Sequence, residues 1–250
     1  YLVGATTADA IADAQAVEVT TTAGAADSTD IPVFDEPASI IFTSGSTGSP
    51  KGVVLPHEVV EMRWRSRDQL AMSLGADRRQ PLVSSLDSSW GIQLLTDISS
   101  GFSNYVVDIA RTGLPAFLSD MAQFRPTAMS LPVQAARLLA QLPDQSLTSL
   151  PSMRRVNLGA EGVRFEYLDG LRRILEPDTE IIHNLASSEG GREIVITFTI
   201  HDAPAQGKVP VGEILFPDDL RLAEVEGHER DVLEVHVSGA IASGYLDDPD

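Results

Sequence analysis

The sequence lacks cysteine and has few lysines and few aromatic residues. None of its 250 residues is cysteine, which excludes disulfides, thiolate metal sites and a cysteine nucleophile. Only two lysines occur, Lys51 and Lys208, and aromatic residues make up 6% of the chain. No run approaches the roughly 18 apolar residues of a membrane span, and no basic-then-apolar signal segment opens the chain. We therefore expect no membrane insertion and a cytoplasmic location.

Positive charge is scarce as well. The chain has 18 lysine and arginine residues against 36 aspartate and glutamate residues, so its formal net charge is −18. A field of this sign repels nucleic acid and anionic membranes, and neither is an expected partner. It also repels nucleotides at long range. Any nucleotide site must therefore be built locally, from loop donors, Lys51 and arginines.

One small-polar loop stands between two apolar segments. Residues 43–52 read TSGSTGSPKG, after the apolar segment 40–42 and before the apolar segment 53–55. This pattern predicts a buried strand, a loop and a second strand. Hydroxyls, backbone N–H groups exposed by glycine, and the Lys51 ammonium are donors that hold a polyphosphate. The alternative is a flexible glycine–serine hairpin with a surface lysine.

The loop resembles the phosphate-loop signature TSGSTGxPKGV of the adenylate-forming superfamily, which includes acyl-CoA synthetases and the adenylation domains of nonribosomal peptide synthetases. The resemblance implies that a carboxylic acid is activated by ATP as an acyl-adenylate, with release of pyrophosphate, and then passed to a thiol. The implied cofactors are ATP and Mg²⁺, and the implied thiol acceptor is CoA or phosphopantetheine. The implied nucleotide ligands in the loop are Thr43, Ser44, Gly45, Ser46, Thr47, Gly48 and Lys51.

Beyond the loop, strand-like and helix-like segments alternate at a spacing of roughly 25 residues. The predicted strands are 81–85, 103–108, 127–131, 154–158 and 179–183, and the predicted helices are 57–74, 90–99, 114–123, 133–141 and 164–175. Such alternation predicts an α/β fold in which helices cover both faces of a parallel sheet.

After about residue 190 the pattern changes to strands alone. Residues 193–200, 209–215 and 232–238 read as strands separated by proline, glycine and aspartate. We therefore predict two regions. An α/β nucleotide- and acid-binding region spans 1–190, and a smaller antiparallel β-rich subdomain spans 191–250.

The resemblance extends to the end of the chain. Residues 244–249 resemble a Gly-Tyr-x-x-x-Pro segment, to which we assign a structural role. Family members continue from this segment into a ribose-binding element and a mobile C-terminal domain that carries a catalytic lysine. The resemblance implies that this C-terminal catalytic domain is absent here and that the chain is a fragment of a longer enzyme.

Two turns come after predicted strands, at the sheet edge where ligands bind in open α/β folds. The first turn contains Gly159, Ala160 and Glu161, and the resemblance implies that its backbone packs against adenine. The second, HNLASSEG at 183–190, resembles the element Asn-x-Tyr-Gly-x-Thr-Glu. The resemblance implies that Ser188 supplies a hydroxyl near the α-phosphate and that Glu189 is the Mg²⁺ ligand. The implied catalytic residues are Lys51, Ser188 and Glu189.

The second turn departs from the family pattern. The asparagine that contacts the adenine amino group aligns with His183, with Asn184 one position later, and the tyrosine aligns with Leu185. We expect His183 and Asn184 at the adenine. For Glu189 the alternative is a solvated loop glutamate.

A third element, SSLDSSWG at 84–91, resembles the Phe-Asp-x-Ser element that opens the substrate pocket of adenylation domains. There the aspartate pairs with the α-ammonium group of the substrate, and Asp87 matches it although Leu86 replaces the phenylalanine. A buried charge needs a partner, and an ammonium group supplies one. The alternative is that Asp87 caps a helix that starts near Ser89. The implied substrate-binding residues are Asp87, Gly91, Val156, Leu158 and Asn184.

Three functions therefore stay open. An amino-acid-activating adenylation domain is favoured by Asp87. A fatty or aryl acyl-CoA or acyl-carrier ligase is the alternative if Asp87 only caps a helix. A non-catalytic nucleotide-binding module is the third function, motivated by the departures at His183 and Leu185. A carrier protein is the expected partner where phosphopantetheine is the acceptor.

Overall fold

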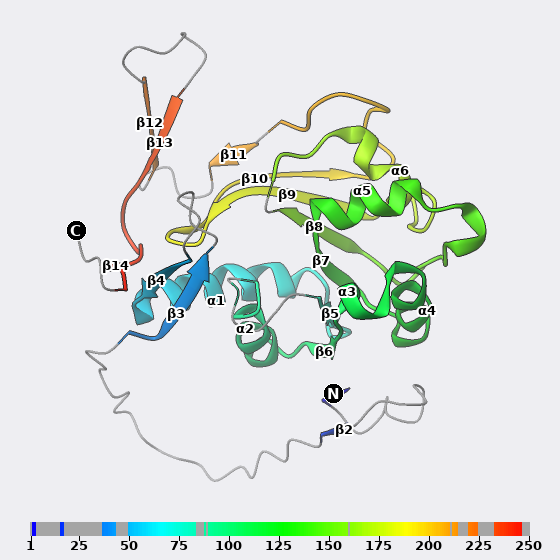
Figure 1. Cartoon of the computed structure of the whole chain (residues 1–250), viewed down its shortest axis with the longest axis horizontal. Coiled ribbons are helices and arrows are strands. Elements are labelled where there is room, and N and C mark those ends of the chain that lie inside the picture. Colours follow the sequence, from blue (N-terminus) through cyan, green and yellow to red (C-terminus); the bar gives the residue numbers. More distant parts are fainter. Residues whose placement is uncertain are drawn as a thin grey trace.

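The computed structural model describes residues 2–3, 16–17, 37–43, 50–83, 88, 90–159, 161–210, 212–214, 220–224 and 233–246 (Figure 1). The loop residues Ser44, Gly45, Ser46, Thr47 and Gly48 lie outside the described residues, as do Asp87 and Ala160. No helix in the described part of the chain is long and apolar enough to cross a membrane.

A five-stranded sheet in the order β11-β10-β9-β8-β7 forms the centre of the fold. Its strands are β7 (Ala128–Pro132), β8 (Arg155–Gly159), β9 (Glu180–Ser187), β10 (Gly191–Thr199) and β11 (Glu213–Ile214). Strands β7, β8 and β9 are parallel, whereas β10 and β11 are antiparallel to their neighbours. The α/β class with parallel strands is confirmed, and the antiparallel edge makes the sheet mixed.

A second sheet, in the order β2-β1-β6-β5, lies beside the first. It contains β1 (Leu2–Val3), β2 (Ala16–Val17), β5 (Arg79–Leu82) and β6 (Ser103–Val106), and β5 and β6 are parallel. Thr127, which precedes β7, joins the two sheets. Its backbone N–H donates to the Arg79 carbonyl at 2.8 Å, and its hydroxyl accepts from the Arg79 N–H at 2.9 Å. Strand β5 therefore starts beside β7.

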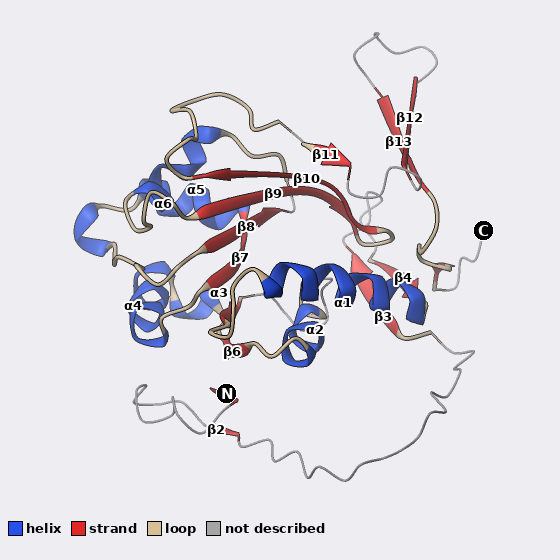
Figure 2. Ribbon diagram, turned by 180° about the vertical axis from the view of Figure 1, so that it is seen from behind, coloured by secondary structure: helices blue, strands red, loops and turns tan. Residues whose placement is uncertain are grey.

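Helices cover both faces of the central sheet. They are α1 (His57–Met72), α2 (Gln93–Ser99), α3 (Ile109–Thr112), α4 (Leu114–Phe124), α5 (Val133–Gln141) and α6 (Asp169–Arg172), with 3-10 turns η2 (Asp144–Ser146) and η3 (Phe165–Leu168). Met129 of β7 is buried in the large core with Phe117 of α4 and Leu139 of α5. Its neighbour Ala128 packs on the other side, near Leu74 and Phe102. Figure 2 accordingly shows α5 and α6 on one side of the sheet and α1 on the other.

The helix predictions agree with the structure where the apolar spacing is regular. The predicted helix 133–141 coincides with α5, and 114–123 ends one residue before α4 does. The helix at 57–74 ends earlier, at Met72, and is followed by Gly75 with a φ angle of 73°. The predicted helix 164–175 is instead the short pair η3 and α6.

Two smaller sheets complete the described fold. One, in the order β14-β4-β3, contains β3 (Ser39–Thr43), β4 (Lys51–Leu55) and β14 (Gly244–Tyr245). The other is the antiparallel pair β12 (Leu220–Glu224) and β13 (Leu233–Val237). The division of the chain near residue 190 stays a prediction. Strand β10 begins just after this position and pairs with β9 along its length, so the strands on either side share one sheet.

Candidate functional site

The hairpin of β3 and β4 holds the two ends of the phosphate-loop segment next to each other. Thr43 is paired with Lys51 across the hairpin, and the Thr43 hydroxyl lies 3.5 Å from the Lys51 carbonyl oxygen. One face of the hairpin is buried. Its side chains Ile41, Val53 and Leu55 are each at most 1% exposed. This apolar anchor fixes the position from which Thr43 and the Lys51 side chain project.

The turn after β9 is held by a hydrogen bond within the turn and by two other parts of the chain. Within the turn, the Gly190 N–H donates to the Ser187 hydroxyl at 2.9 Å. Arg63 of α1 donates to the Ser188 carbonyl at 2.7 Å. The N–H of Ala242, just before β14, donates to the Glu189 carbonyl at 2.9 Å. Ser188 and Glu189 therefore occupy a backbone position set by the turn itself, by α1 and by the chain leading into β14.

Tyr245 of β14 connects this turn to the phosphate-loop hairpin. Its hydroxyl donates to Glu189 Oε1 at 2.9 Å, and the ammonium of Lys51 lies 4.9 Å from the centre of its ring. The hydrogen bond to the negative Glu189 raises the pKa of Tyr245, so the phenol stays a neutral donor. The structure thus brings together two of the three predicted catalytic side chains, Lys51 and Glu189, at one aromatic ring.

The sequence reasoning missed this role of Tyr245, because it assigned residues 244–249 only a structural role. The available signal was the Gly-Tyr-x-x-x-Pro string itself. A strand as short as β14 gives no periodicity from which its partner could be read.

Unpaired polar atoms lie on the three parallel strands, at the middle of β7 and of β8 and toward the carboxyl end of β9. They are Ser130 Oγ on β7, Asn157 Oδ1 on β8 and Asn184 Oδ1 on β9, and we name the three together the acceptor strip. Each of these atoms is buried and has no hydrogen-bond partner among the residues that the structure describes. Ser130 and Asn157 are cross-strand neighbours, and their side chains are 4% and 6% exposed. Buried polar atoms normally have partners, so this strip indicates a position for water or a ligand.

Gly159 and Trp90 border the acceptor strip. A Cβ atom at Gly159 would lie 3.2 Å from the Trp90 ring and 3.3 Å from Asn184 Oδ1, so these two side chains meet above the end of β8. Gly91 is buried next to Trp90, with its N–H 3.0 Å from the Ser88 hydroxyl. The predicted site residues Gly91, Gly159 and Asn184 therefore lie near one another.

Val156 and Leu158 point away from the acceptor strip. Both side chains have 0% exposure and belong to the large core between the sheet and the helices. Asn157 lies between them in β8, and alternation along a strand places it on the opposite face. The substrate-binding role of Val156 and Leu158 stays a prediction. Ser130 and Asn157, which the sequence analysis did not name, carry unpaired buried oxygens on the opposite face of the sheet.

His183 is also buried at the sheet. Its side chain is 6% exposed, and its Nδ1 lies 3.2 Å from the Leu158 carbonyl oxygen of the adjacent strand. Glu161, one residue beyond the undescribed Ala160, is exposed. The predicted adenine contacts of His183, Gly159, Ala160 and Glu161 stay predictions.

The sequence of the chain matches the model of a known protein family. The family model described as AMP-binding enzyme matches residues 3–246. The chain belongs to the AMP-binding enzyme family. Recognition of the adenylate-forming superfamily from the loop and the two turns is thereby confirmed.

Individual relatives of this AMP-binding chain include peptide synthetases. It is 31% identical over 216 residues to CymA, a probable nonribosomal peptide synthetase of Salinispora arenicola, a match that covers 85% of this chain and 3% of that protein. It is 30% identical over 158 residues to the indigoidine synthase of Dickeya dadantii, covering 61% of this chain and 10% of that protein. The chain thus spans a small part of the curated relatives that it matches.

Solved structures, one of them named as an adenylation domain, share the fold. The Vibrio cholerae adenylation domain AlmE, in complex with glycyl-adenosine-5'-phosphate, aligns with a TM-score of 0.69 at 22% identity, over 85% of this chain and 41% of that chain. VinN with L-aspartate aligns with a TM-score of 0.67 at 20% identity, over 89% of this chain and 55% of that chain. These matches confirm the α/β fold of the AMP-binding family.

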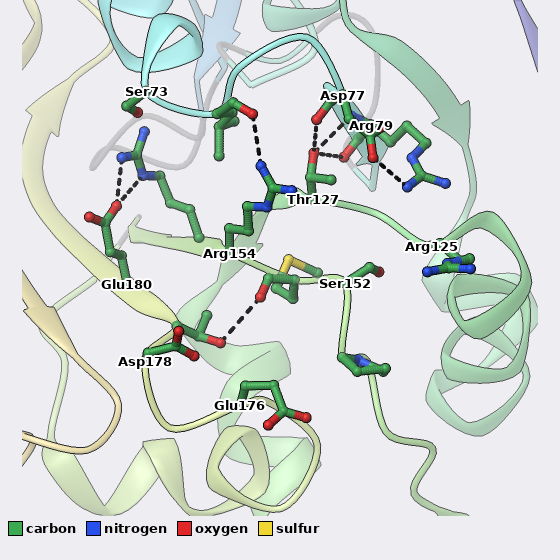
Figure 3. A pocket seen from close by; sticks show the side chains of 15 residues that line it. Ser73, Asp77, Arg79, Arg125, Thr127, Ser152, Arg154, Glu176, Asp178 and Glu180 are labelled. Carbon is green, nitrogen blue, oxygen red and sulfur yellow. Dashed lines mark hydrogen bonds and ion pairs between the residues drawn. The ribbon is translucent and has the colours of Figure 1, made fainter.

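Within the AMP-binding chain, a separate groove of about 720 Å³ lies at the opposite edge of the sheet, where β5, β7, β8 and β9 begin (Figure 3). Three of the four arginines that line it contact the protein itself. Arg155 forms an ion pair with Glu180, Arg154 donates to the Leu74 carbonyl at 3.0 Å, and Arg79 donates to Asp77 at 2.8 Å. Ligands in open α/β folds bind at the carboxyl ends of the strands. We therefore place the candidate site at Tyr245 and the acceptor strip.

Proposed function

We propose that this chain supplies the nucleotide- and acid-binding region of an enzyme that activates a carboxylic acid with ATP. The observation that carries the proposal is the convergence of Lys51 and Glu189 on Tyr245. Strand β9, which leads into the turn with Glu189, belongs to the sheet that bears the acceptor strip. A mobile cation and a carboxylate at one aromatic side chain suit the phosphates of a nucleotide and its metal ion.

The proposed reaction is the formation of an acyl-adenylate. A carboxylate oxygen of the acid attacks the α-phosphorus of ATP, the bond from that phosphorus to the bridging oxygen breaks, and pyrophosphate leaves. Such chemistry depends mainly on positioning and on neutralising charge. Lys51 and the loop hold the β- and γ-phosphates, while Thr43 and Ser188 add hydroxyl contacts.

Mg²⁺ fits the residues present at this site. No group of three or more His, Asp or Glu side chains gathers in the part of the chain that the structure describes, so no all-protein metal cage is formed there. Mg²⁺ bound with a nucleotide typically uses one or two carboxylates together with phosphate oxygens and water. Glu189 supplies one such carboxylate. When bound, Mg²⁺ neutralises phosphate charge.

The favoured substrate is an amino acid with a polar side chain. Asp87 is proposed to pair with the α-ammonium group. The acceptor strip adds buried oxygens at Ser130, Asn157 and Asn184 that lack donors. A fatty acid would leave these oxygens unpaired at about 1–3 kcal/mol each, which disfavours that alternative.

The thiol acceptor is proposed to be the phosphopantetheine of a carrier protein, with CoA as the alternative. The support is that CymA and other relatives are named as peptide synthetases. The proposed compartment is the cytoplasm.

Substrate-dependent pyrophosphate release by the intact protein tests this proposal. We expect release with polar amino acids, little release with fatty or aryl acids, and a loss of about 10–100-fold in Asp87→Ala, the scale of a lost charged hydrogen bond. Release with fatty or aryl acids that is indifferent to Asp87 would assign the protein to the acyl-CoA ligases. ATP binding without any release would support the non-catalytic module instead.

Lys51→Ala tests the phosphate contact. We expect ATP use to weaken by about 1–3 kcal/mol, the cost of a lost charged hydrogen bond, with the KM for the acid unchanged. The other lysine, Lys208, is exposed and lies away from the site, so Lys208→Ala is the matched control. Equal ATP dependence of the two variants would remove Lys51 from the mechanism.

A further inference from the structure

Tyr245 contacts two oppositely charged groups that the proposed function uses. The Lys51 ammonium faces its ring at 4.9 Å, and the Glu189 carboxylate accepts from its hydroxyl at 2.9 Å. Neither Lys51 nor Glu189 forms an ion pair with any residue that the structure describes. The phenol therefore contacts both groups and leaves neither charge neutralised.

The backbone around Tyr245 fixes this position from two sides. On the hairpin side, Tyr245 is paired with Val53, and the Leu246 N–H donates to the Gly52 carbonyl at 2.6 Å. On the side of the turn after β9, the Ala242 N–H donates to the Glu189 carbonyl at 2.9 Å. The segment 242–246 is therefore clamped between the strand that carries Lys51 and the turn that carries Glu189, and both contacts determine where the phenol lies.

We propose that Tyr245 is a positioning residue that orients the Glu189 carboxylate toward the metal–nucleotide complex and keeps Lys51 from pairing with it. This inference rests on the proposed function. The Tyr245 hydroxyl donates its hydrogen bond to Oε1 of Glu189, so Oε2 stays available to bind a cation. Residues that hydrogen-bond to a metal ligand fix its orientation, and their loss typically weakens metal binding about 10–100-fold.

The ring and the hydroxyl of Tyr245 have separable tasks. The face of an aromatic ring attracts a cation without removing its charge, so Lys51 stays able to contact phosphate. Phenylalanine keeps that face but lacks the hydroxyl. Tyr245→Phe therefore releases Glu189 while it keeps Lys51 in place, whereas Tyr245→Leu removes both contacts.

The experiment measures Mn²⁺ binding by electron paramagnetic resonance, with a non-hydrolysable ATP analogue present and Mn²⁺ replacing Mg²⁺. Binding of the same analogue in EDTA is measured in parallel. For Tyr245→Phe we expect Mn²⁺ affinity to fall about tenfold or more. Metal-free nucleotide binding should stay within about twofold, since Lys51 still faces a ring. In Tyr245→Leu both should fall.

Tyr105→Phe is the matched control, because Tyr105 also donates its hydroxyl to a carboxylate, Asp120, at 3.3 Å but lies on the other sheet. Its Mn²⁺ affinity should equal that of the wild type. If wild-type protein binds Mn²⁺ with nucleotide and Tyr245→Phe binds it equally well, the positioning role is overturned while the proposed function stands. A parallel loss of Mn²⁺ and metal-free nucleotide binding in Tyr245→Phe would also overturn it and indicate a purely structural tyrosine. Absence of binding by the wild type would overturn both proposals.

Discussion

Gly170→Ala is expected to destabilise the chain by about 2–3 kcal/mol, a severe case of overpacking in a dense core. Gly170 is a buried residue of α6 that packs directly on α5. A Cβ atom there would lie 2.4 Å from the Leu139 carbonyl carbon and 2.5 Å from the Ala140 nitrogen. Both are backbone atoms inside a helix, so neither can rotate away as a side chain would. Helix α6 must move off α5 instead, and the contacts of Leu171 with the core weaken.

Intrinsic helix propensity acts in the opposite direction but is too small to compensate. Alanine favours a helix over glycine by about 1 kcal/mol. A net loss of about 2–3 kcal/mol is a large fraction of the 5–15 kcal/mol typical of domains. Urea unfolding followed by circular dichroism measures the difference between Gly170→Ala and the wild type.

Gly162→Ala provides the control for this prediction. A Cβ atom at Gly162 would meet no other atom within 4 Å, and the residue has no positive φ angle, so alanine fits without strain. Its free energy of unfolding should change by no more than about 0.5 kcal/mol, as for most surface substitutions. A Gly170→Ala protein as stable as Gly162→Ala would contradict the close packing of α6 on α5.

The order of strands and helices could be predicted because their signals are local. The regular apolar spacing from 133 to 141 defines α5 to the residue, and the short apolar runs before it and after it locate β7 and β8. The pairing of strands is not local. The antiparallel addition of β10 to a parallel sheet depends on the turn at 187–190, which sequence periodicity does not describe.

Which face of a central strand bears unpaired polar side chains was harder to predict, for a physical reason. Central parallel strands are buried on both faces, so apolar residues occur at successive positions and the alternation is weak. In β8 the sequence Val156-Asn157-Leu158 offers either face as the ligand side. The family resemblance assigned Val156 and Leu158 to the substrate, and this role stays a prediction. The structure buries both side chains in the core and leaves Asn157 Oδ1 unpaired.

The contact between Tyr245 and Glu189 could not be predicted from the sequence. The two residues are 56 positions apart, and their contact requires both the pairing of β14 with β4 and the turn after β9. The individual motifs were visible in the sequence, and the resemblance to a family assigned Lys51 and Glu189 to one site. Only the structure identifies a single side chain that touches both.

Glu189→Gln is expected to reduce acid-dependent pyrophosphate release by about 10²–10³-fold. A bound metal ion contributes several kcal/mol by stabilising charge in the transition state, and each 1.36 kcal/mol is a factor of about ten. Glutamine has the same shape as glutamate, and its amide oxygen can still accept the hydrogen bond from Tyr245. The substitution therefore removes the negative charge and leaves the geometry of the turn intact.

The control for Glu189→Gln is Glu176→Gln, which removes one exposed carboxylate from the groove at the opposite edge of the sheet. Both variants lower the net negative charge equally, so any effect of long-range electrostatics on ATP is shared between them. A large loss confined to Glu189→Gln, partly restored by higher Mg²⁺ concentration, is the expected result. Equal rates in the two variants would mean that Glu189 does not bind the metal. The Tyr245 hydrogen bond would then stabilise only the packing of β14 against the turn.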